Sequence, residues 1–388
     1  MIENMKREFE GHVIPFWKGL IDRENGGFYG EMDFDLNLDK KAVKGCILNS
    51  RILWFFSNAF MTLGDTSCLE YAEHAFCFLK KAFLDRKYGG VYWSVTFDGK
   101  PAEDMKHTYN IAFAIYGLSS YYDASKNEEA LKLAKELYNT IETKCRDEYG
   151  YLEAFTREFG EESNEKLSEN GVMASRTMNT LLHVMEAYTE LYRVSGDEDV
   201  KDKLKFILKL FREKLFDPEK ERMEVFFDMD YNSLIDLHSF GHDIETAWLI
   251  DRTVEVLGAK GTEYDMTDIT DILADKIYRD CFNGSSLPSE NCKGIVDETR
   301  VWWVECEAIV GFINVFQKSG NTKYLDAAYK LWKFIEIYLI DKRDGSEWYS
   351  DVNKEGVPES RKPIVDQWTC PYHNGRMYFE VLKRIGKR

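Results

Sequence analysis

The sequence of 388 residues predicts an all-α protein, folded as an (α/α)6 barrel of twelve helices, six inner and six outer. Three observations predict this fold. A short glycine-aromatic signature recurs along the chain, two amphipathic segments lie between successive copies, and alternate segments differ in how much of their circumference is apolar. Recurrence at a fixed period is typical of repeat architectures, in which each unit buries its apolar face against its neighbours.

The glycine-aromatic signature occurs at intervals of about sixty residues, four times clearly and twice in weaker form. The clear copies are Gly26–Gly30, Gly89–Trp93, Gly150–Leu152 and Gly345–Tyr349, and the weaker ones are Glu224–Phe227 and Gly284–Leu287. No Pro-rich or Gly/Ser-rich linker divides the chain, so we expect residues 1–388 to form a single domain.

Apolar residues recur at helical spacing in two stretches per repeat. The predicted helices are 2–22, 49–62, 68–84, 107–123, 127–144, 174–195, 198–216, 242–258, 265–280, 299–318, 322–340 and 371–386. Those that begin at 49, 107, 174, 242, 299 and 371 are apolar around much of their circumference, which predicts an inner ring. Their partners carry charge on one face, as outer helices do, and we expect short β-like loops at one end of the barrel.

The two terminal helices decide between a closed barrel and an open solenoid. A solenoid needs terminal repeats with a polar outer face. Both terminal helices instead carry an apolar stripe, which includes Phe9 and Trp17 in the first and Tyr378 and Leu382 in the last. We therefore expect them to pair and close the ring; a generic helical bundle is the alternative.

Composition excludes several classes of partner. A formal net charge of -17 disfavours nucleic acid, which binds clustered Lys and Arg. The N-terminus is charged and no apolar run is long enough for a membrane span. The eight cysteines form no CxxC pair and are expected to be reduced thiols. We expect a cytoplasmic monomer without a nucleic-acid or membrane partner, and the 14% of aromatic residues suggests a ligand site.

Polar residues begin every predicted inner helix, and parallel inner helices would bring them to one end of the barrel. Helix capping explains the Ser, Thr, Asn and Asp residues there. Capping does not explain Arg51, His107, His242 and His373, which stand at the same places. This end of the barrel is therefore the predicted active site, although His107, like His238, is as readily a structural histidine.

His242 and His373 are the predicted acid-base pair, because an imidazole can accept or donate a proton at cellular pH. Glu245 lies one helical turn after His242, close enough to hold its imidazole or to touch a substrate hydroxyl; a first-turn acid favoured by the helix dipole is the alternative. Arg51 carries a fixed positive charge suited to a developing oxyanion, unless it is held in an ion pair.

Aromatic and acidic residues near these positions suit a carbohydrate. Trp302, Trp303 and Trp368 offer flat apolar faces for the C–H face of a sugar, or they are core residues. Glu307, one turn beyond Trp303, is a candidate for hydrogen bonds to sugar hydroxyls. The chain lacks nucleotide-binding, zinc-protease and nucleophile-elbow motifs. The histidine spacings match no standard metal-ligand set, so we expect no metal and no other cofactor.

Five stretches of the sequence resemble those of the cellobiose 2-epimerases, which belong with the N-acylglucosamine 2-epimerases and aldose-ketose isomerases. They are Lys44–Trp54, Met105–Asn110, Gly241–Glu245, Arg300–Trp303 and Cys370–Arg376. The resemblance extends along essentially the whole chain. It implies reversible conversion of cellobiose to 4-O-β-glucosyl-mannose, and of lactose to epilactose, without metal or nucleotide.

The resemblance also implies roles for individual residues. His242 and His373 would be the acid-base pair, and Arg51 would bind near the reacting oxygens. The positions that match pocket-lining positions of the family are Tyr109, Asn179, His183, Glu245, Trp303, Glu307 and Trp368. The implied reaction opens the sugar ring, removes the C2 proton to give an enediolate, and returns a proton to the opposite face.

Three other functions remain open from the sequence. An inverting glycoside hydrolase would need two carboxylates about 6.5–9.5 Å apart, for which Glu245 and Glu307 are the candidates. A sugar-binding module would leave the paired histidines without a role. Within the family, an N-acylglucosamine or monosaccharide epimerase or isomerase is the nearest alternative function, because the sequence does not identify the residues that would bind the second ring of a disaccharide.

Overall fold

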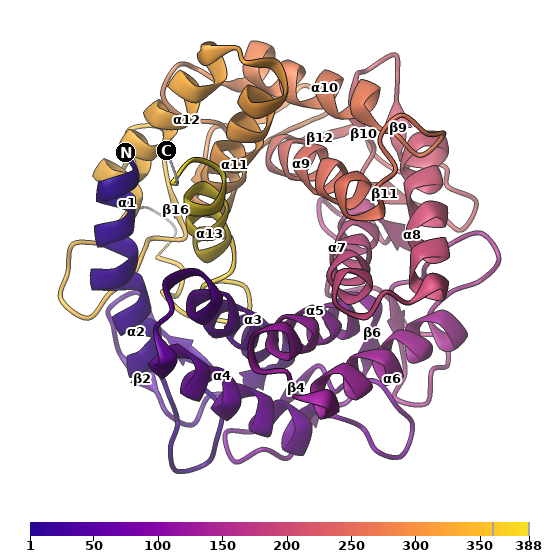
Figure 1. The fold of residues 1–388 in the computed structure, drawn as a ribbon, viewed down its shortest axis with the longest axis vertical. Coiled ribbons are helices and arrows are strands. Elements are labelled where there is room, and N and C mark those ends of the chain that lie inside the picture. The colour runs from indigo at the N-terminus through magenta and orange to yellow at the C-terminus, as the bar shows by residue number, and fades with distance from the viewer. Residues whose placement is uncertain (359–360, 387–388) are drawn as a thin grey trace.

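The computed structural model describes residues 1–358 and 361–386. In these residues the helices form two concentric rings, as Figure 1 shows. The inner ring consists of α3 (Cys46–Leu63), α5 (Thr108–Ser125), α7 (Met178–Ser195), α9 (Phe240–Leu257), α11 (Trp302–Ser319) and α13 (His373–Ile385). The prediction of an (α/α)6 barrel is confirmed.

The outer ring is formed by six helical runs, most of which contain a π-helical turn. These runs are α1 (Ile2–Glu8) with η1 (Phe9–Val13) and α2 (Ile14–Gly19), α4 (Thr66–Phe78) with η2 (Leu79–Phe83), α6 (Glu128–Lys144), α8 (Glu198–Leu210) with η3 (Phe211–Leu215), α10 (Thr267–Lys276) with η4 (Ile277–Cys281), and α12 (Thr322–Phe334) with η5 (Ile335–Leu339).

Four inner helices, α3, α5, α7 and α11, are each joined to the next outer helix by a tight turn, whereas a longer loop joins α9 to α10. The α3 helix ends at Gly64, which has a left-handed backbone with φ 73°, and Asp65 then accepts a hydrogen bond from the backbone N–H of Ser67 to begin α4. Asn127, Asp197 and Asn321 cap α6, α8 and α12 in the same way. A left-handed residue followed by an Asx cap ends one helix and starts another within two residues.

Short antiparallel strands cover the other end of the barrel, where the inner helices begin. They are β1 (Glu31–Met32), β2 (Leu38–Asp39), β3 (Lys44–Gly45), β4 (Ser94–Val95), β5 (Pro101–Glu103), β6 (Lys106–His107), β7 (Ala154–Phe155), β8 (Arg176–Thr177), β9 (Phe216–Asp217), β10 (Arg222–Met223), β11 (Phe226–Phe227), β12 (Leu237–Ser239), β13 (Glu290–Cys292), β14 (Ile295–Asp297), β15 (Arg300–Val301) and β16 (Asp351–Val352). The predicted β-like loops are these strands.

Five of these strands connect successive repeats. β3, β6, β8, β12 and β15 each lead directly into an inner helix and pair with β4, β7, β11, β13 and β16 of the following repeat. This pairing corrects two predicted helix starts. The helices expected from 174 and 299 begin at Met178 and Trp302, because the residues just before them lie in β8 and β15.

The N- and C-terminal helices close the ring. The Phe9 ring stacks on Tyr378 at 4.6 Å between ring centroids and meets the edge of Phe379 at 5.2 Å. In Figure 1 the first helix, α1, lies beside α13. The expected pairing of the terminal apolar stripes is therefore confirmed. None of the helices in the described residues is both long and apolar enough for a membrane span.

Candidate active site

The predicted site residues come together at the N-terminal end of the inner ring. Every inner helix contributes at least one of them, and the loop before α13 contributes Trp368. The set comprises Arg51 on α3, Tyr109 on α5, Asn179 and His183 on α7, His242 and Glu245 on α9, Trp302, Trp303 and Glu307 on α11, and His373 on α13.

His373 is the first residue of α13 and is nearly buried, with 8% of its surface exposed. Its Nδ1 lies 2.7 Å from Oε1 of Glu307. Burial lowers the pKa of His373 well below its ordinary value, and the nearby Arg376 and Arg51 lower it further. A neutral imidazole that donates Nδ1–H to Glu307 keeps its lone pair on Nε2, so His373 is arranged to accept a proton.

His242 lies in the first turn of α9 and has a different partner. Its Nδ1 hydrogen-bonds the Ser239 hydroxyl at 2.7 Å. Burial lowers the pKa of His242 to about 3, with a smaller contribution from His183. Ser239 thus holds this imidazole, a role that the sequence suggested for Glu245.

The indole of Trp303 lies against both histidines. Its ring centroid is 4.8 Å from that of His242 and 5.5 Å from that of His373. Trp302 is 5% exposed and meets His373 edge-on at 5.4 Å. Trp303 is half-buried and therefore presents surface to a ligand, whereas Trp302 mainly packs behind His373.

Arg51 carries an uncompensated positive charge. Its guanidinium donates hydrogen bonds to the Tyr109 hydroxyl at 2.9 Å and to the Cys370 sulfur at 3.5 Å. It stacks on the rings of Phe113 and Tyr372, with the guanidinium carbon 4.1 and 4.4 Å from their centroids. Among the described residues no carboxylate lies within ion-pair distance of Arg51, so the alternative of a structural ion pair does not apply.

A second set of aromatic rings lies beside Arg51. Trp368 is half-buried, and its ring lies 6.1 Å from both Tyr109 and Trp93. Tyr109 also meets the edge of His183 at 5.1 Å. Burial raises the pKa of Tyr109 to about 12, so its hydroxyl stays protonated and can donate a hydrogen bond while accepting one from Arg51.

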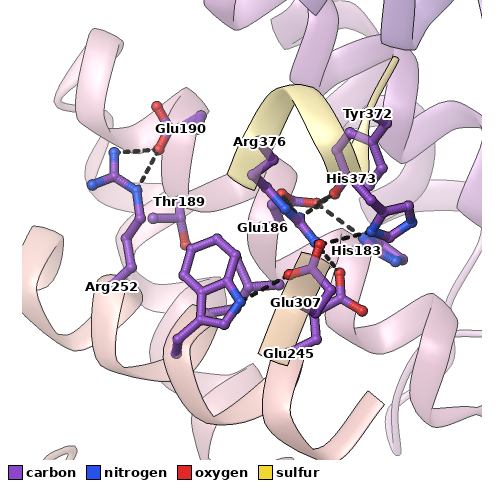
Figure 2. Close-up of polar contacts among 12 residues, drawn as sticks. His183, Glu186, Thr189, Glu190, Glu245, Arg252, Glu307, Tyr372, His373 and Arg376 are labelled. Atoms are coloured by element: carbon purple, nitrogen blue, oxygen red, sulfur yellow. Dashed lines mark hydrogen bonds and ion pairs between the residues drawn. The ribbon is translucent and has the colours of Figure 1, made fainter. Parts of the chain in front are cut away.

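Three carboxylates surround one guanidinium at the base of the site (Figure 2). Arg376 donates to Glu186 at 2.5 Å and to Glu245, and its Nη2 lies 2.6 Å from Glu307. Burial raises the pKa of Glu245 to about 7 although Arg376 opposes this shift. Burial also favours the protonated form of Glu186, but Arg376 and His183 outweigh it and lower the pKa of Glu186 to about 2.

Two of the sequence-predicted polar residues carry buried oxygen atoms without a partner. Oδ1 of Asn179 and Oε2 of Glu245 make no hydrogen bond within the described part of the chain. A buried polar atom without a partner costs free energy, so such atoms commonly receive their hydrogen bonds from a ligand. Both atoms belong to the cluster of residues predicted to bind substrate.

Two histidines of uncertain role prove to be structural. His107 accepts a hydrogen bond from the backbone N–H of Tyr109 and lies 3.0 Å from Asn164. His238 lies 2.8 Å from Asp243. Both are buried in the strands that lead into inner helices; both ring nitrogens of His107 and Nε2 of His238 are engaged by these neighbours.

Arg376 and Glu186 were missed by the sequence analysis. Each follows a predicted site histidine by three residues, since Arg376 follows His373 and Glu186 follows His183. Residues three apart share one face of a helix, so this spacing is the signal that could have found them. Their mutual contact joins α7 to α13 and is not visible in the sequence.

Glu245, Glu307 and His373 could hold a metal ion, because one donor atom of each lies within 4.8 Å of the others. Arg376 already places a positive charge against both carboxylates. A metal ion at this position would compete with the guanidinium for the same oxygen atoms.

Comparison with known proteins agrees with this geometry. The profile of the family described as N-acylglucosamine 2-epimerase matches residues 27–374. The chain is 51% identical to a cellobiose 2-epimerase of Ruminococcus albus over 99% of both chains. It is also similar to a solved sugar epimerase from a ruminal bacterium, with 51% identity and a TM-score of 0.98 over 99% of each chain.

A second solved structure, the cellobiose 2-epimerase of Bacillus thermoamylovorans, is 44% identical, with a TM-score of 0.96 over 99% of each chain. These similarities cover the whole barrel, including every inner helix that contributes to the site. The chain therefore belongs to the N-acylglucosamine 2-epimerase family and is a carbohydrate epimerase.

Proposed function

We propose that the enzyme inverts C2 of the reducing-end glucose of β-1,4-linked disaccharides, converting cellobiose to 4-O-β-glucosyl-mannose and lactose to epilactose. The observation that carries this proposal is the pair of histidines, His242 and His373, whose rings both contact Trp303. Similarity to cellobiose 2-epimerases over the full length supports the disaccharide substrate.

The proposed reaction begins with opening of the sugar ring, since the C2 proton is acidic only when C1 is an aldehyde. His373 assists this opening and then removes the C2 proton through its free Nε2. The electron pair of the C2–H bond moves into an enediolate, and its negative charge develops near Arg51. Arg51 suits this role because no carboxylate of the described residues neutralises it.

Inversion requires a proton donor on the opposite face of the intermediate. After rotation about the C2–C3 bond, the protonated imidazole of His242 gives its proton to C2 and becomes neutral, and the ring closes to give the epimer. Exchange with solvent then removes the proton from His373 and restores the one on His242. The reverse reaction exchanges the roles of the two histidines. Proton return to C1 would instead yield a ketose, so the same intermediate serves an epimerase and an isomerase.

The substrate is proposed to lie between the aromatic and polar residues of the site. Trp303 and Trp368 offer exposed indole surface for the C–H faces of the sugar. Tyr109, Asn179, His183 and the free oxygen of Glu245 would bind its hydroxyl groups, and Trp302 supports His373 from behind.

An inverting glycoside hydrolase is less compatible with the site. Such enzymes keep their two carboxyl groups about 6.5–9.5 Å apart, with space for a water between them. Oxygens of Glu245 and Glu307 lie within 4.8 Å of each other, and the guanidinium of Arg376 is bound to both. Neither carboxylate is free to act as an independent general base.

The test is incubation of the purified protein with cellobiose, followed by proton NMR of the products. Glucosyl-mannose is the expected product, and its formation should fall by at least about a thousandfold in His242→Ala and His373→Ala. Release of free glucose would instead identify a hydrolase. Turnover of N-acetylglucosamine or mannose in place of cellobiose would assign the enzyme to another substrate within the family.

The proposal includes a cytoplasmic location, a monomeric state and a reaction without a cofactor. The eight cysteines are all free thiols, as proteins of a reducing compartment have. Size-exclusion chromatography with light scattering would test the monomer, and activity after exhaustive chelation would test the metal-free reaction.

A further inference from the structure

Arg376 has no role in the proposed chemistry, although it lies at the centre of the site. It follows His373 by one helical turn on α13 and is 2% exposed. Its guanidinium contacts three carboxylates from three inner helices, Glu186 on α7, Glu245 on α9 and Glu307 on α11. Figure 2 shows these side chains converging on it.

Glu307 links Arg376 to the predicted base. Its Oε1 lies 2.6 Å from Arg376 and 2.7 Å from Nδ1 of His373, and its Oε2 accepts a hydrogen bond from Trp248 at 2.9 Å. Both oxygens are therefore engaged, which fixes the plane of the carboxylate. A carboxylate in a fixed plane orients the imidazole that donates to it and determines which ring nitrogen carries the proton.

Arg376 also lines a cavity that lies on the other side of the predicted site residues. This cavity, of about 770 Å³, lies at the C-terminal end of the inner ring, and Arg376 and Glu186 line its inner end. A separate ion pair, Arg252 with Glu190 at 2.6 Å, lines the same cavity farther from the site (Figure 2). A small solute that enters this cavity reaches the position of Arg376 without passing the substrate.

We propose that Arg376 is a positioning residue, which holds Glu307 so that His373 keeps Nδ1–H bonded and Nε2 free to take the substrate's C2 proton. The proposal rests on the proposed function, since it assigns Arg376 a part in that reaction. Arg376 itself touches neither substrate nor reacting atoms.

The charges around His373 predict how loss of Arg376 changes proton transfer. The titratable and charged groups that face it are Arg51 from α3, His183 and Glu186 from α7, His242 and Glu245 from α9, Glu307 from α11, and Tyr372 and Arg376 beside it. Arg376 disfavours a positive charge on His373, and it neutralises the carboxylates that would favour one. Without it the pKa of His373 rises, so the base is neutral only at higher pH.

The first test is the pH profile of kcat for cellobiose epimerisation in Arg376→Met. We expect kcat at neutral pH to fall by about a hundredfold with KM changed by less than about threefold, and the acidic limb to move up by at least about one pH unit. Arg252→Met is the matched control, because it removes a half-buried arginine of the same cavity whose hydrogen bonds, within the described part of the chain, go to Glu190. The control variant should leave the acidic limb of the pH profile unchanged.

Arg376→Lys and chemical rescue keep the proposal testable if the methionine variant folds poorly. The lysine variant retains the positive charge but lacks the planar guanidinium with its several N–H donors. The acidic limb of its pH profile should therefore stay near that of the wild type, while kcat falls. Guanidinium ion, added to Arg376→Ala at concentrations that do not unfold the protein, should enter through the 770 Å³ cavity that Arg376 lines and restore activity at least about fivefold. It should not do so for Arg252→Ala.

A readout independent of turnover separates failure of this proposal from failure of the proposed function. In protein with ¹⁵N-labelled histidines, the His373 signals, identified by their absence in His373→Gln, should titrate at higher pH in Arg376→Met than in the wild type. An unchanged titration and an unchanged acidic limb would overturn the positioning role. Absence of any epimerisation by the wild type would overturn the proposed function, whatever the titration shows.

Discussion

The hydrogen-bond partners of the two histidines suit different tasks. As a carboxylate, the form that Arg376 favours, Glu307 can only accept, so it fixes the proton of His373 on Nδ1 and leaves Nε2 as a base. The hydroxyl of Ser239 can donate or accept, so His242 can carry its proton on either nitrogen. Burial lowers the pKa of both imidazoles, so His373 is neutral before it takes the C2 proton and a protonated His242 gives its proton up readily.

Arg51 provides the first prediction at the scale of a residue. Arg51→Met removes the only charge proposed to stabilise the enediolate, so kcat for epimerisation should fall by about 10²–10³, with a smaller change in KM. Steady-state kinetics with cellobiose measures both constants. Arg343→Met is the control, because this arginine forms an ion pair with Asp341 and contacts none of the predicted site residues in the described part of the chain, and it should retain wild-type kcat. A kcat within twofold of wild type in Arg51→Met would exclude this role.

The sequence was sufficient to find residues whose type is unusual for their position. Histidine, arginine and tryptophan are uncommon caps, so Arg51, His242, His373 and Trp303 could be recognised at helix starts. The role of Arg376, which also lies near the start of its helix, could not be recognised in this way, because its three carboxylate partners are on other helices. Ion pairs between distant helices depend on the packing of the barrel, which helical periodicity alone does not specify.

At the scale of an element, each outer helix is followed by a turn that the sequence analysis described only in part. Asp22, Asp85, Asp147 and Asp217 occupy equivalent places and accept hydrogen bonds from backbone N–H groups two and three residues later. The glycine-aromatic signature follows these turns. Helical periodicity placed the helices correctly, but it misplaced two helix starts because strand pairing between repeats competes with helix formation there.

Asp22 provides the prediction at this scale. It is fully buried and forms an ion pair at 2.7 Å with Lys44, which leads into α3. Asp22→Ala leaves the buried lysine without a carboxylate, with only the carbonyl of Gly26 to accept from it, so the free energy of unfolding should fall by about 3–5 kcal/mol. Urea denaturation followed by circular dichroism measures this change.

Asp217→Ala is the matched control, because Asp217 forms the equivalent turn but its lysine partner, Lys220, is 47% exposed. Its loss should cost only about 1 kcal/mol. Equal destabilisation by the two substitutions would show that the turn, and not the buried ion pair, provides the stability.

At the scale of the whole molecule, closure of the ring makes the two ends of the chain depend on each other. The apolar stripes of the terminal helices predicted this closure, and α13 lies between α11 and α3 in the closed ring. The barrel brings residues from all six inner helices to one end. No repeat could hold the site alone, because His242 and His373 belong to different repeats and meet through Trp303 of a third.

Substitution of Phe9 tests whether the two ends of the chain depend on each other for stability. Phe9 is fully buried against Tyr378 and Phe379, so Phe9→Ala should lower the free energy of unfolding by about 3–5 kcal/mol, in a single cooperative transition. Tyr329→Ala, at a 44% exposed position on α12, should change it by less than about 0.5 kcal/mol. Loss of the terminal helices in a separate transition, with the rest still folded, would indicate an open repeat array.

The central claim is that C2 is inverted by removal and return of its proton, and the most direct measurement is proton NMR of the reaction with cellobiose in D₂O. Glucosyl-mannose should form with deuterium at C2, and neither His242→Ala nor His373→Ala should form the deuterated product. Glucosyl-mannose that retains the original proton at C2, under conditions where histidine protons exchange with solvent, would contradict a mechanism in which one histidine removes this proton and the other supplies a new one.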